Sequence, residues 1–341
     1  MLFAVSCNRQ QNQKSSFTTL PKELRNNMHL LAQTSYYANE DFTIHETAVL
    51  AIEAGVKLTM CDTCHIYCKG AIIAQGTDTN FIEIGAKNKE TKLHFTSSKL
   101  ESSFNNTYFN NTSIYVSRTS FKMDSCHFNE YDYLEKSKLV SFVLSSFNST
   151  VHLSNSFFTG NNLKEGIGFN KGSCTIVNNK FSKHPDAIEL SNLESALVKN
   201  NQIEYSSDDG IDLNNCKNSL ISDNSIRFSK DKGISVGNRK MLSKEQSIKI
   251  RNNLISDNKI GIAVKKNALV EIYNCTLSNN EIGLFFSEDK VTDETLVSIV
   301  DSTRFKNNKQ ISNSRENPNV RYSNCFSNSY LPGIGNSQYS N

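Results

Sequence analysis

The strongest constraint on the fold is a repeat of about 22 residues that runs through the second half of the chain. Each copy carries the pattern Gly-Ile-x-Val or a close variant of it, and the second positions of successive copies are 21, 23, 23, 28 and 22 residues apart. A fixed period of this length is typical of solenoids, in which each repeat buries its apolar face only against its neighbours. The copies begin at Gly166, Ala187, Gly210, Gly233, Gly261 and Gly283.

A second ladder with the same period lies between these copies. Its central residues are Asn179, Asn201, Asn224, Asn253 and Cys275, and each has an apolar residue three positions before it and another two positions after it. Short apolar strands with Gly and Asn at the corners favour β-structure with tight turns over helices. We therefore predict an all-β parallel β-helix, in which stacked Asn side chains take left-handed backbone positions and hydrogen-bond to the coils above and below.

Composition excludes several classes of function. The 341 residues include 37 basic and 34 acidic residues, mixed along the chain, for a formal net charge of +3. Nucleic-acid binding demands a basic patch or stripe, which this pattern lacks, so we expect no nucleic-acid partner. No run approaches the 18 or so apolar residues of a membrane-spanning helix.

The first residues suggest export. Residues 1–7 form a short apolar run that ends in Ser6-Cys7, followed by a polar tether, as at the end of a bacterial lipoprotein signal. The run lacks a basic segment before it, and Ala4 stands where Leu is commonest. Two interpretations stay open: lipidation of Cys7, which would be the only attachment to a membrane, or a plain disordered terminus. We expect an extracytoplasmic protein, either secreted or lipid-anchored at the cell surface.

The predicted domain organisation has three parts. Residues 1–18 form the export-like terminus and tether, residues 19–305 form the β-helix, and residues 306–341 form a C-terminal cap or loose tail. A capping helix is expected over residues 19–33, because Thr19 could cap it, Pro21 suits its first turn, and Leu24, Met28 and Leu31 fall on one helical face. Such a helix would cover the open strand edges of the first coil.

A cysteine motif near residue 61 has two interpretations, a haem or metal site and interior packing. Cys61-Asp62-Thr63-Cys64-His65 matches the attachment pattern of haem c, and Cys68 adds a further metal ligand. In a strand, however, Cys64, Ile66 and Cys68 would point to one face. We expect these cysteines to serve as small apolar side chains in the interior.

Chemistry is expected on outward-facing columns of side chains. In Gly-Ile-x-Val the Ile and Val point inward and x points outward, so Glu189, Asp212 and Ser235 form one column. Because neighbouring coils lie about 4.8 Å apart, stacked carboxylates would raise one another's pKa or recruit a cation. A second column precedes the pattern and a third follows it. The second contains Glu165, Asp186, Asp209 and Lys232, and the third contains Asn214, Gly237 and Lys265.

The long interval of 28 residues predicts an extra loop beside these columns. This loop contains Asn238-Arg239-Lys240. A basic edge beside an acidic cluster would suit an anionic sugar, so Arg239 and Lys240 are candidate substrate-binding residues.

The repeat resembles the right-handed parallel β-helix proteins of the pectate-lyase-like superfamily, over most of the chain. Four segments also resemble, in order, the active-site segments of polygalacturonases, which read Asn-Thr-Asp-Gly, Asp-Asp, Gly-His-Gly-Ile-Ser-Ile-Gly and Arg-Ile-Lys. Here the family's His is Lys232 and its Arg is Ala263. The corresponding segments are Pro185-Asp186-Ala187-Ile188-Glu189, Asp208-Asp209-Gly210-Ile211, Lys232-Gly233-Ile234-Ser235-Val236-Gly237 and Gly261-Ile262-Ala263-Val264-Lys265.

The resemblance implies catalytic roles for three aspartates. Asp186 would protonate the leaving oxygen, while Asp208 and Asp209 would activate water. Lys265 would bind the substrate carboxylate.

A lyase is the alternative that the Lys232 and Ala263 departures leave open. Resemblance to bacterial β-helix lyases implies a proton abstraction beside a uronate carboxylate, with Lys232 as the base. Calcium would then neutralise the carboxylate, held by Asp209, Asp212 and Glu189 together with Asp186.

The functional hypothesis is thus an exported surface protein that binds an acidic polysaccharide and cleaves it, as a uronate lyase or a glycoside hydrolase. The alternative is a noncatalytic glycan-binding or structural, adhesin-like β-helix, since Asp before Gly also simply makes a good turn.

Overall fold

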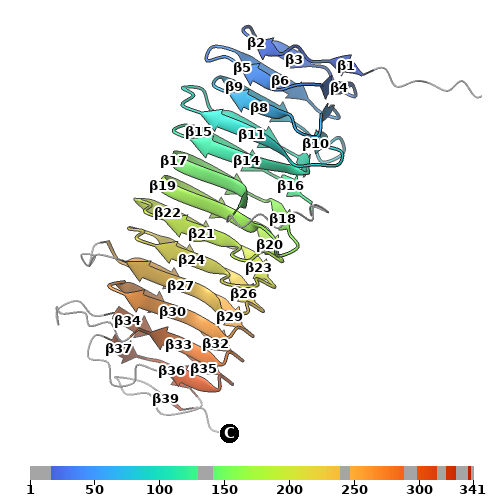
Figure 1. Cartoon of the computed structure of the whole chain (residues 1–341). Coiled ribbons are helices and arrows are strands. Elements are labelled where there is room, and N and C mark those ends of the chain that lie inside the picture. The colour runs from blue at the N-terminus through green and yellow to red at the C-terminus, as the bar shows by residue number, and fades with distance from the viewer. Residues whose placement is uncertain are drawn as a thin grey trace, which may run out of the picture.

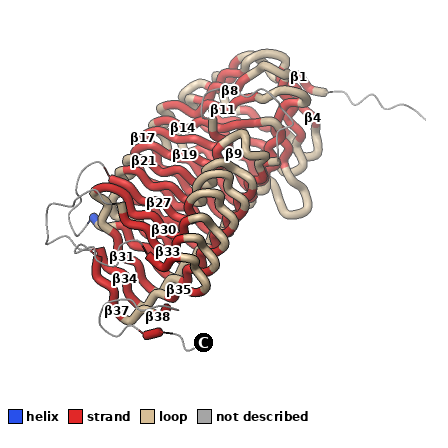
Figure 2. The backbone as a smooth tube through the Cα atoms, turned by 60° about the horizontal axis from the view of Figure 1, so that its bottom comes forward, coloured by secondary structure: helices blue, strands red, loops and turns tan. Residues whose placement is uncertain are grey.

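The computed structural model is an elongated β-solenoid (Figure 1), which confirms the predicted parallel β-helix. It describes residues 17–129, 141–238, 246–287, 298–312, 320–327 and 337–338. Every strand pairing in this part of the chain is parallel and joins one coil to the next, as the stacked rings of Figure 2 show. No helix among these residues has the length and apolar character needed to cross a membrane.

Each coil contributes to three faces. The first face carries the Gly-Ile-x-Val strands, and β17 and β19 bend to continue into the second face. The first face consists of β2 (Glu23–Leu24), β5 (Phe42–Ile44), β8 (His65–Cys68), β11 (Thr91–Thr96), β14 (Thr112–Ser117), β17 (Phe142–Ser154), β19 (Glu165–Val177), β21 (Ile188–Ser191), β24 (Ile211–Asn214), β27 (Lys232–Asn238), β30 (Ile260–Lys266), β33 (Ile282–Phe286) and β36 (Gln310–Ser312).

The second and third faces close each coil. The second face adds β3 (Met28–Leu30), β6 (Val49–Glu53), β9 (Ala71–Gln75), β12 (Ser102–Asn105), β15 (Ser120–Asp124), β22 (Ser195–Lys199), β25 (Leu220–Ser222), β28 (Ile248–Arg251), β31 (Val270–Tyr273), β34 (Ser298–Asp301) and β37 (Val320–Ser323). The third face consists of β1 (Thr18–Thr19), β4 (Ser35–Ala38), β7 (Lys57–Met60), β10 (Ile82–Ala86), β13 (Thr107–Asn110), β16 (His127–Phe128), β18 (Phe157–Thr159), β20 (Lys180–Ser182), β23 (Gln202–Glu204), β26 (Ser225–Arg227), β29 (Leu254–Ser256), β32 (Thr276–Ser278), β35 (Arg304–Lys306), β38 (Phe326–Ser327) and β39 (Ser337–Gln338).

The apolar columns predicted from the repeat form the core. On the first face Ile188, Ile211 and Ile234 are partners in successive strands, and each is fully buried. The second and third faces show the same register, for example Val198 with Ile221 and Ile203 with Ile226. Because each strand alternates inward and outward positions, this register also fixes which side chains face solvent.

The asparagine ladder forms, with one difference from the prediction. Nδ2 of Asn201 donates to Oδ1 of Asn224 at 3.0 Å, and the backbone N–H of Asn201 donates to the same oxygen at 2.9 Å. The left-handed position is taken by the residue before each ladder member, such as Asn200 with φ of 55°. The ladder residue itself points into the interior, where its hydrogen bonds satisfy buried backbone groups.

The N-terminal capping helix is not found. Residues 18–30 contain strands β1, β2 and β3, which pair in parallel with β4, β5 and β6. The expected helical face is not a buried face, since Leu24 is 6% exposed but Leu31 is 58% exposed. Pairing with the next coil therefore overrides the local helical pattern, and this segment is itself the first coil.

The last coils extend past residue 305. Strands β36, β37 and β38 pair with β33, β34 and β35 in the register of the preceding coils.

Cysteines fill small interior spaces, as expected for Cys68, which is buried. Cys61 and Cys64 are joined in a disulfide, which the sequence pattern did not predict.

Candidate functional site

The three predicted columns lie side by side on the first face, across β19, β21, β24, β27 and β30. Glu189 of β21 is the register partner of Asp212 of β24, which in turn pairs with Ser235 of β27. Asn214 pairs with Gly237, and Gly237 pairs with Lys265. The sequence therefore placed these outward positions in the correct register.

The acidic column is a ladder of hydrogen bonds between coils. The backbone N–H of Asp186 donates to Oε2 of Glu165, and that of Asp209 donates to Oδ1 of Asp186 at 2.8 Å. The backbone N–H of Lys232 donates in turn to Oδ1 of Asp209 at 3.0 Å. Each carboxylate thus accepts the N–H at the equivalent position of the next coil, which holds the side chains at fixed positions just before their strands.

Burial raises the pKa values of the carboxyl groups in this column. Burial raises the pKa of Asp186 to about 8 and that of Glu165 to about 7, although backbone N–H donors act in the opposite direction. Burial also raises the pKa of Asp209, to about 6, and Lys232 opposes that rise. At neutral pH the Asp186 carboxyl is therefore mainly neutral, while the Asp209 carboxylate is mainly charged.

Lys232 ends the acidic column as a paired cation. Its Nζ lies 3.2 Å from Oδ1 of Asp209 and also contacts Oδ2 of Asp231. Burial acts to lower the pKa of Lys232, but its hydrogen bonds and charge interactions with Asp231 and Asp209 outweigh it and leave the pKa raised. Lys259 adds a second cation to Asp231, at 3.5 Å. The ammonium of Lys232 therefore stays protonated across the physiological range.

The middle column is less accessible than expected. Nδ2 of Asn214 donates to Oδ2 of Asp212, whereas Oδ1 of Asp212 is buried without a hydrogen-bond partner. Burial raises the pKa of Glu189, and the charge of Asp212 raises it further. Ser235 is fully buried although its strand position faces outward.

The carboxylates suited to a cation differ from the predicted set. One oxygen from each of Asp186, Asp208 and Asp209 lies within 4.8 Å of the others. Asp186 and Asp209 belong both to this group and to the predicted calcium ligands, whereas Asp208 replaces Asp212 and Glu189. Carboxylate oxygens are the ligands that calcium prefers, and Asp208 is exposed to solvent, so this cluster fits a hard cation in donor type.

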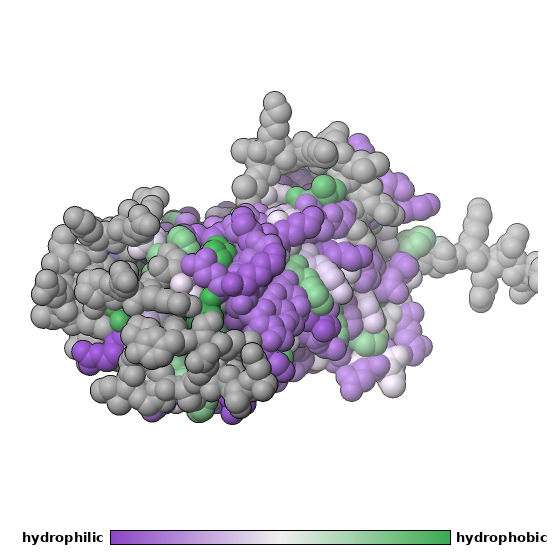
Figure 3. All heavy atoms as spheres, turned by 90° about the horizontal axis from the view of Figure 1, so that it is seen from below, coloured by the Kyte–Doolittle hydropathy of each residue, from purple (hydrophilic) through white to green (hydrophobic). Residues whose placement is uncertain are grey.

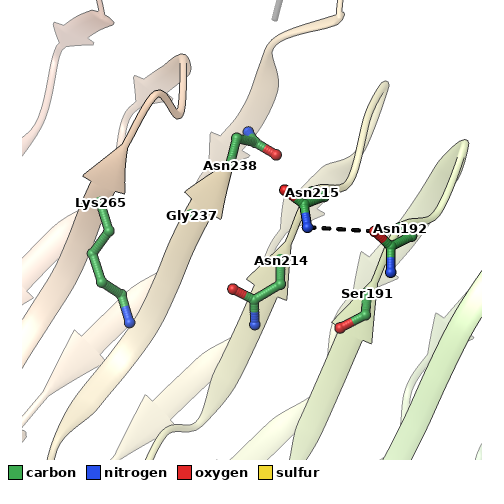
Figure 4. A pocket seen from close by; sticks show the side chains of 7 residues that line it. All are labelled: Ser191, Asn192, Asn214, Asn215, Gly237, Asn238 and Lys265. Carbon is green, nitrogen blue, oxygen red and sulfur yellow. Dashed lines mark hydrogen bonds between the residues drawn. The ribbon is translucent and has the colours of Figure 1, made fainter. Parts of the chain in front are cut away.

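A pocket of about 420 Å³ adjoins the columns on the C-terminal side of the strands. Figure 4 shows Lys265, Asn214 and Ser191 pointing back toward the strand starts, with Asn215 and Asn238 at the other side of the pocket. Nδ2 of Asn215 donates to Oδ1 of Asn192 at 3.3 Å. Sequence reasoning found Lys265, Asn214 and Gly237 and placed Asn238 in an adjoining loop, whereas Asn238 is the last residue of β27. It missed Ser191, Asn192 and Asn215, for which the recurring Asn at the strand ends was the available signal.

Arg239 and Lys240, predicted to bind substrate, lie outside the described residues, as does Cys7. The surface of the described residues is mainly hydrophilic when the molecule is viewed from below (Figure 3).

The stacked parallel coils and the outward polar columns define a right-handed parallel β-helix protein. The family described as "right handed beta helix region" matches residues 134–246 and 186–341, which together cover more than half of the chain. The chain belongs to this right-handed β-helix family. A search of curated protein sequences gives no match.

One solved structure shares the fold at low sequence identity, and two others are similar at lower TM-scores. Tailspike protein 3 of bacteriophage CBA120 is 10% identical, with a TM-score of 0.56 over 91% of this chain; the chain spans 57% of that tailspike. The periplasmic alginate epimerase AlgG is 12% identical, with a TM-score of 0.47 over 87% of this chain and 77% of its own. The A-module of the Azotobacter vinelandii mannuronan C-5 epimerase AlgE4 is 12% identical, with a TM-score of 0.45 over 92% and 91%.

Proposed function

We propose that the first face binds an acidic polysaccharide and that its aspartate cluster hydrolyses a glycosidic bond. The observation that carries this proposal is a neutral carboxyl beside a charged one: Asp186, with its pKa raised to about 8, lies next to Asp209, whose pKa is about 6. Two carboxyl groups whose environments separate their pKa values are the pair that acid–base hydrolysis requires.

Each aspartate of the cluster has its own role in the proposed reaction. Asp186 donates its proton to the glycosidic oxygen as the bond from that oxygen to the anomeric carbon breaks. A water molecule, deprotonated by the carboxylates of Asp208 and Asp209, attacks the anomeric carbon. Asp208 is the exposed member of the cluster and gives water access. Solvent then restores the proton of Asp186.

The state of Lys232 favours hydrolysis over elimination. A lyase base must be neutral to remove a proton, whereas Asp209 and Asp231 raise the pKa of Lys232. In the hydrolase, Lys232 instead helps to keep Asp209 charged. Lys265, the cation among the described residues that line the pocket, would bind a uronate carboxylate.

Calcium belongs to the alternative lyase reaction, because an ion bound to the acidic cluster would keep Asp186 from carrying the proton that hydrolysis needs. The carboxylates of Asp186, Asp208 and Asp209 would hold it, and it would supply positive charge to an acidic substrate. Because polysaccharides of this kind occur outside the cytoplasm, the proposal also places the protein in an extracytoplasmic compartment.

Noncatalytic glycan binding is the second candidate. It is favoured by the fact that Glu165, Asp186 and Asp209 each accept a backbone N–H from the next coil, which is a structural role that needs no chemistry.

Incubation with a panel of acidic polysaccharides tests the choice. Formation of new reducing ends without unsaturated products would support hydrolysis, provided that the rate of their formation falls at least about 100-fold in Asp186→Asn. Unsaturated products would support the lyase instead, and binding without products would support the noncatalytic function.

The cluster oxygens lie closer than the roughly 6.5–9.5 Å usual between the carboxyl groups of inverting enzymes. NMR of the first anomer formed would therefore show whether water or a carboxylate attacks the anomeric carbon.

A further inference from the structure

We propose that the pocket beside the acidic columns is a subsite for the acetamido group of an N-acetylated sugar. This inference rests on the proposed binding of a polysaccharide to this face, and it names one of the sugars. The pocket is lined by Ser191, Asn192, Asn214, Asn215, Gly237, Asn238 and Lys265. Its volume of about 420 Å³ falls within the range of small-molecule sites.

Asn238 provides the first argument. Its side chain is 3% exposed, yet neither Oδ1 nor Nδ2 has a hydrogen-bond partner. Buried amides are almost always satisfied, so an unpaired donor and an unpaired acceptor on one side chain suit a polar group of a ligand. Figure 4 places this amide at the edge of the pocket, facing Asn215.

The unpaired atoms suit a secondary amide. An acetamido group offers one N–H, which would donate to Oδ1, and one carbonyl oxygen, which would accept from Nδ2. A carboxylate could accept from Nδ2 but would leave Oδ1 without a donor. The amide of Asn238 therefore selects against a second uronate at this position.

Gly237 provides the second argument. A Cβ built on Gly237 would meet only Oδ1 of Asn214 at 3.5 Å and Cβ of Lys265 at 3.8 Å. Every other glycine within the described ranges has either a positive φ or a contact below 3.0 Å for an added Cβ, as Gly233 and Gly261 do. Neither backbone conformation nor close packing explains the glycine at 237, so the free space beside it is available to a small apolar group.

The acetamido methyl fits that space. It would lie over the bare backbone of Gly237 and against the aliphatic stem of Lys265 while the amide pairs with Asn238. Since Lys265 points back toward the start of its strand in Figure 4, its ammonium remains free for the carboxylate of a neighbouring uronate. A polysaccharide that alternates uronate and N-acetylhexosamine satisfies both requirements.

Calorimetry with two octasaccharides tests the inference. One probe alternates glucuronate and N-acetylglucosamine, and the other is an oligogalacturonate without acetamido groups. We expect the wild type to bind the acetamido probe at least about tenfold more tightly, a preference that Asn238→Leu and Gly237→Val abolish. Both variants should change oligogalacturonate affinity by less than about threefold. Gln202→Leu, on the third face, should change neither affinity.

The variants are expected to fold. Asn238→Leu removes an unpaired buried amide at similar volume, so its Tm should equal or exceed that of the wild type. Equal binding of the two probes by the wild type, or unchanged acetamido binding in Asn238→Leu, would overturn the inference while leaving polysaccharide binding intact. If the wild type bound neither probe nor any other acidic polysaccharide, the proposed function and this inference would fail together.

Discussion

Oδ1 of Asp209 accepts both the backbone N–H and the ammonium of Lys232, at 3.0 and 3.2 Å. The side chains are 7% and 15% exposed, so this is a largely buried ion pair between adjacent coils. It links the fold to the site, because the same contacts that stack one coil on the next also set the charge of a candidate catalytic carboxylate.

Replacing Lys232 with Met should raise the pKa of Asp209 and destabilise the protein. The substitution removes the cation that opposes burial, so Asp209 would titrate above its present value of about 6. A buried carboxylate without its partner costs roughly 1–3 kcal/mol in free energy of unfolding near pH 8, and less once it is protonated. Carboxyl NMR titration and urea unfolding measure the two effects.

Lys259→Met is the matched control. Lys259 lies 3.5 Å from Asp231 but is 57% exposed, so its loss should cost less than about 1 kcal/mol. Equal effects of the two substitutions would contradict a special role for the Lys232 contact.

Stability should fall between pH 6.5 and 8.5 through Asp186. Its pKa of about 8 in the folded state lies above the unfolded value of 3.8, so the folded state binds the extra proton. The stabilising contribution of this proton is complete below the pKa of Asp186 in the unfolded state and disappears as pH rises through about 8. The free energy of unfolding should therefore fall by about 1–2 kcal/mol between pH 6.5 and 8.5. Chemical unfolding at the two pH values measures it.

Asp186→Asn isolates this effect from the other titrating groups. Between pH 6.5 and 8.5, the free energy of unfolding of the variant should fall by about 1–2 kcal/mol less than that of the wild type. Identical pH profiles for the two proteins would show that Asp186 is charged throughout and cannot serve as the proton donor.

The interior asparagine ladder should carry a large share of local stability. Asn201→Ala removes the acceptor of the Asn179 N–H and Nδ2, and its own donors to Asn224 and Ile176, all in a buried setting. Two or more unsatisfied groups predict a loss of about 2–4 kcal/mol. Thermal and urea unfolding would measure it.

Asn200→Gly is the control for the ladder, because Gly tolerates the positive φ at this exposed corner and only one exposed hydrogen bond, to Asn178, is lost. Its cost should stay below about 1 kcal/mol. A cost as large as that of Asn201→Ala would contradict the distinction between interior and corner positions.

The repeat made the register predictable because a shift of one residue would expose every inward Ile. Ile188, Ile211 and Ile234 therefore also located Glu189, Asp212 and Ser235. The capping helix failed for the opposite reason: the spacing of Leu24, Met28 and Leu31 is a local signal, and pairing with the next coil decided the outcome.

The candidate site was less predictable than the fold. The period placed Asp186, Asp209 and Lys232 in one column, but their protonation depends on burial and on Asp231, which the pattern did not single out. The unpaired amide of Asn238 could not be foreseen, since it depends on what surrounds that side chain in three dimensions.

Calcium should bind more tightly after Lys232→Met than to the wild type. The ammonium of Lys232 is a tethered cation at Asp209, and a calcium ion on the Asp186, Asp208 and Asp209 cluster must work against its charge. Removing that charge predicts a larger rise in Tm on adding calcium to the variant than to the wild type, and Lys232→Met combined with Asp208→Asn should abolish the difference. Because burial keeps Asp186 mainly neutral below its pKa of about 8, the rise should also be larger at pH 8.5 than at pH 6.5. Equal shifts in all proteins at both pH values would mean that any bound calcium lies elsewhere and that the cluster works through protons alone.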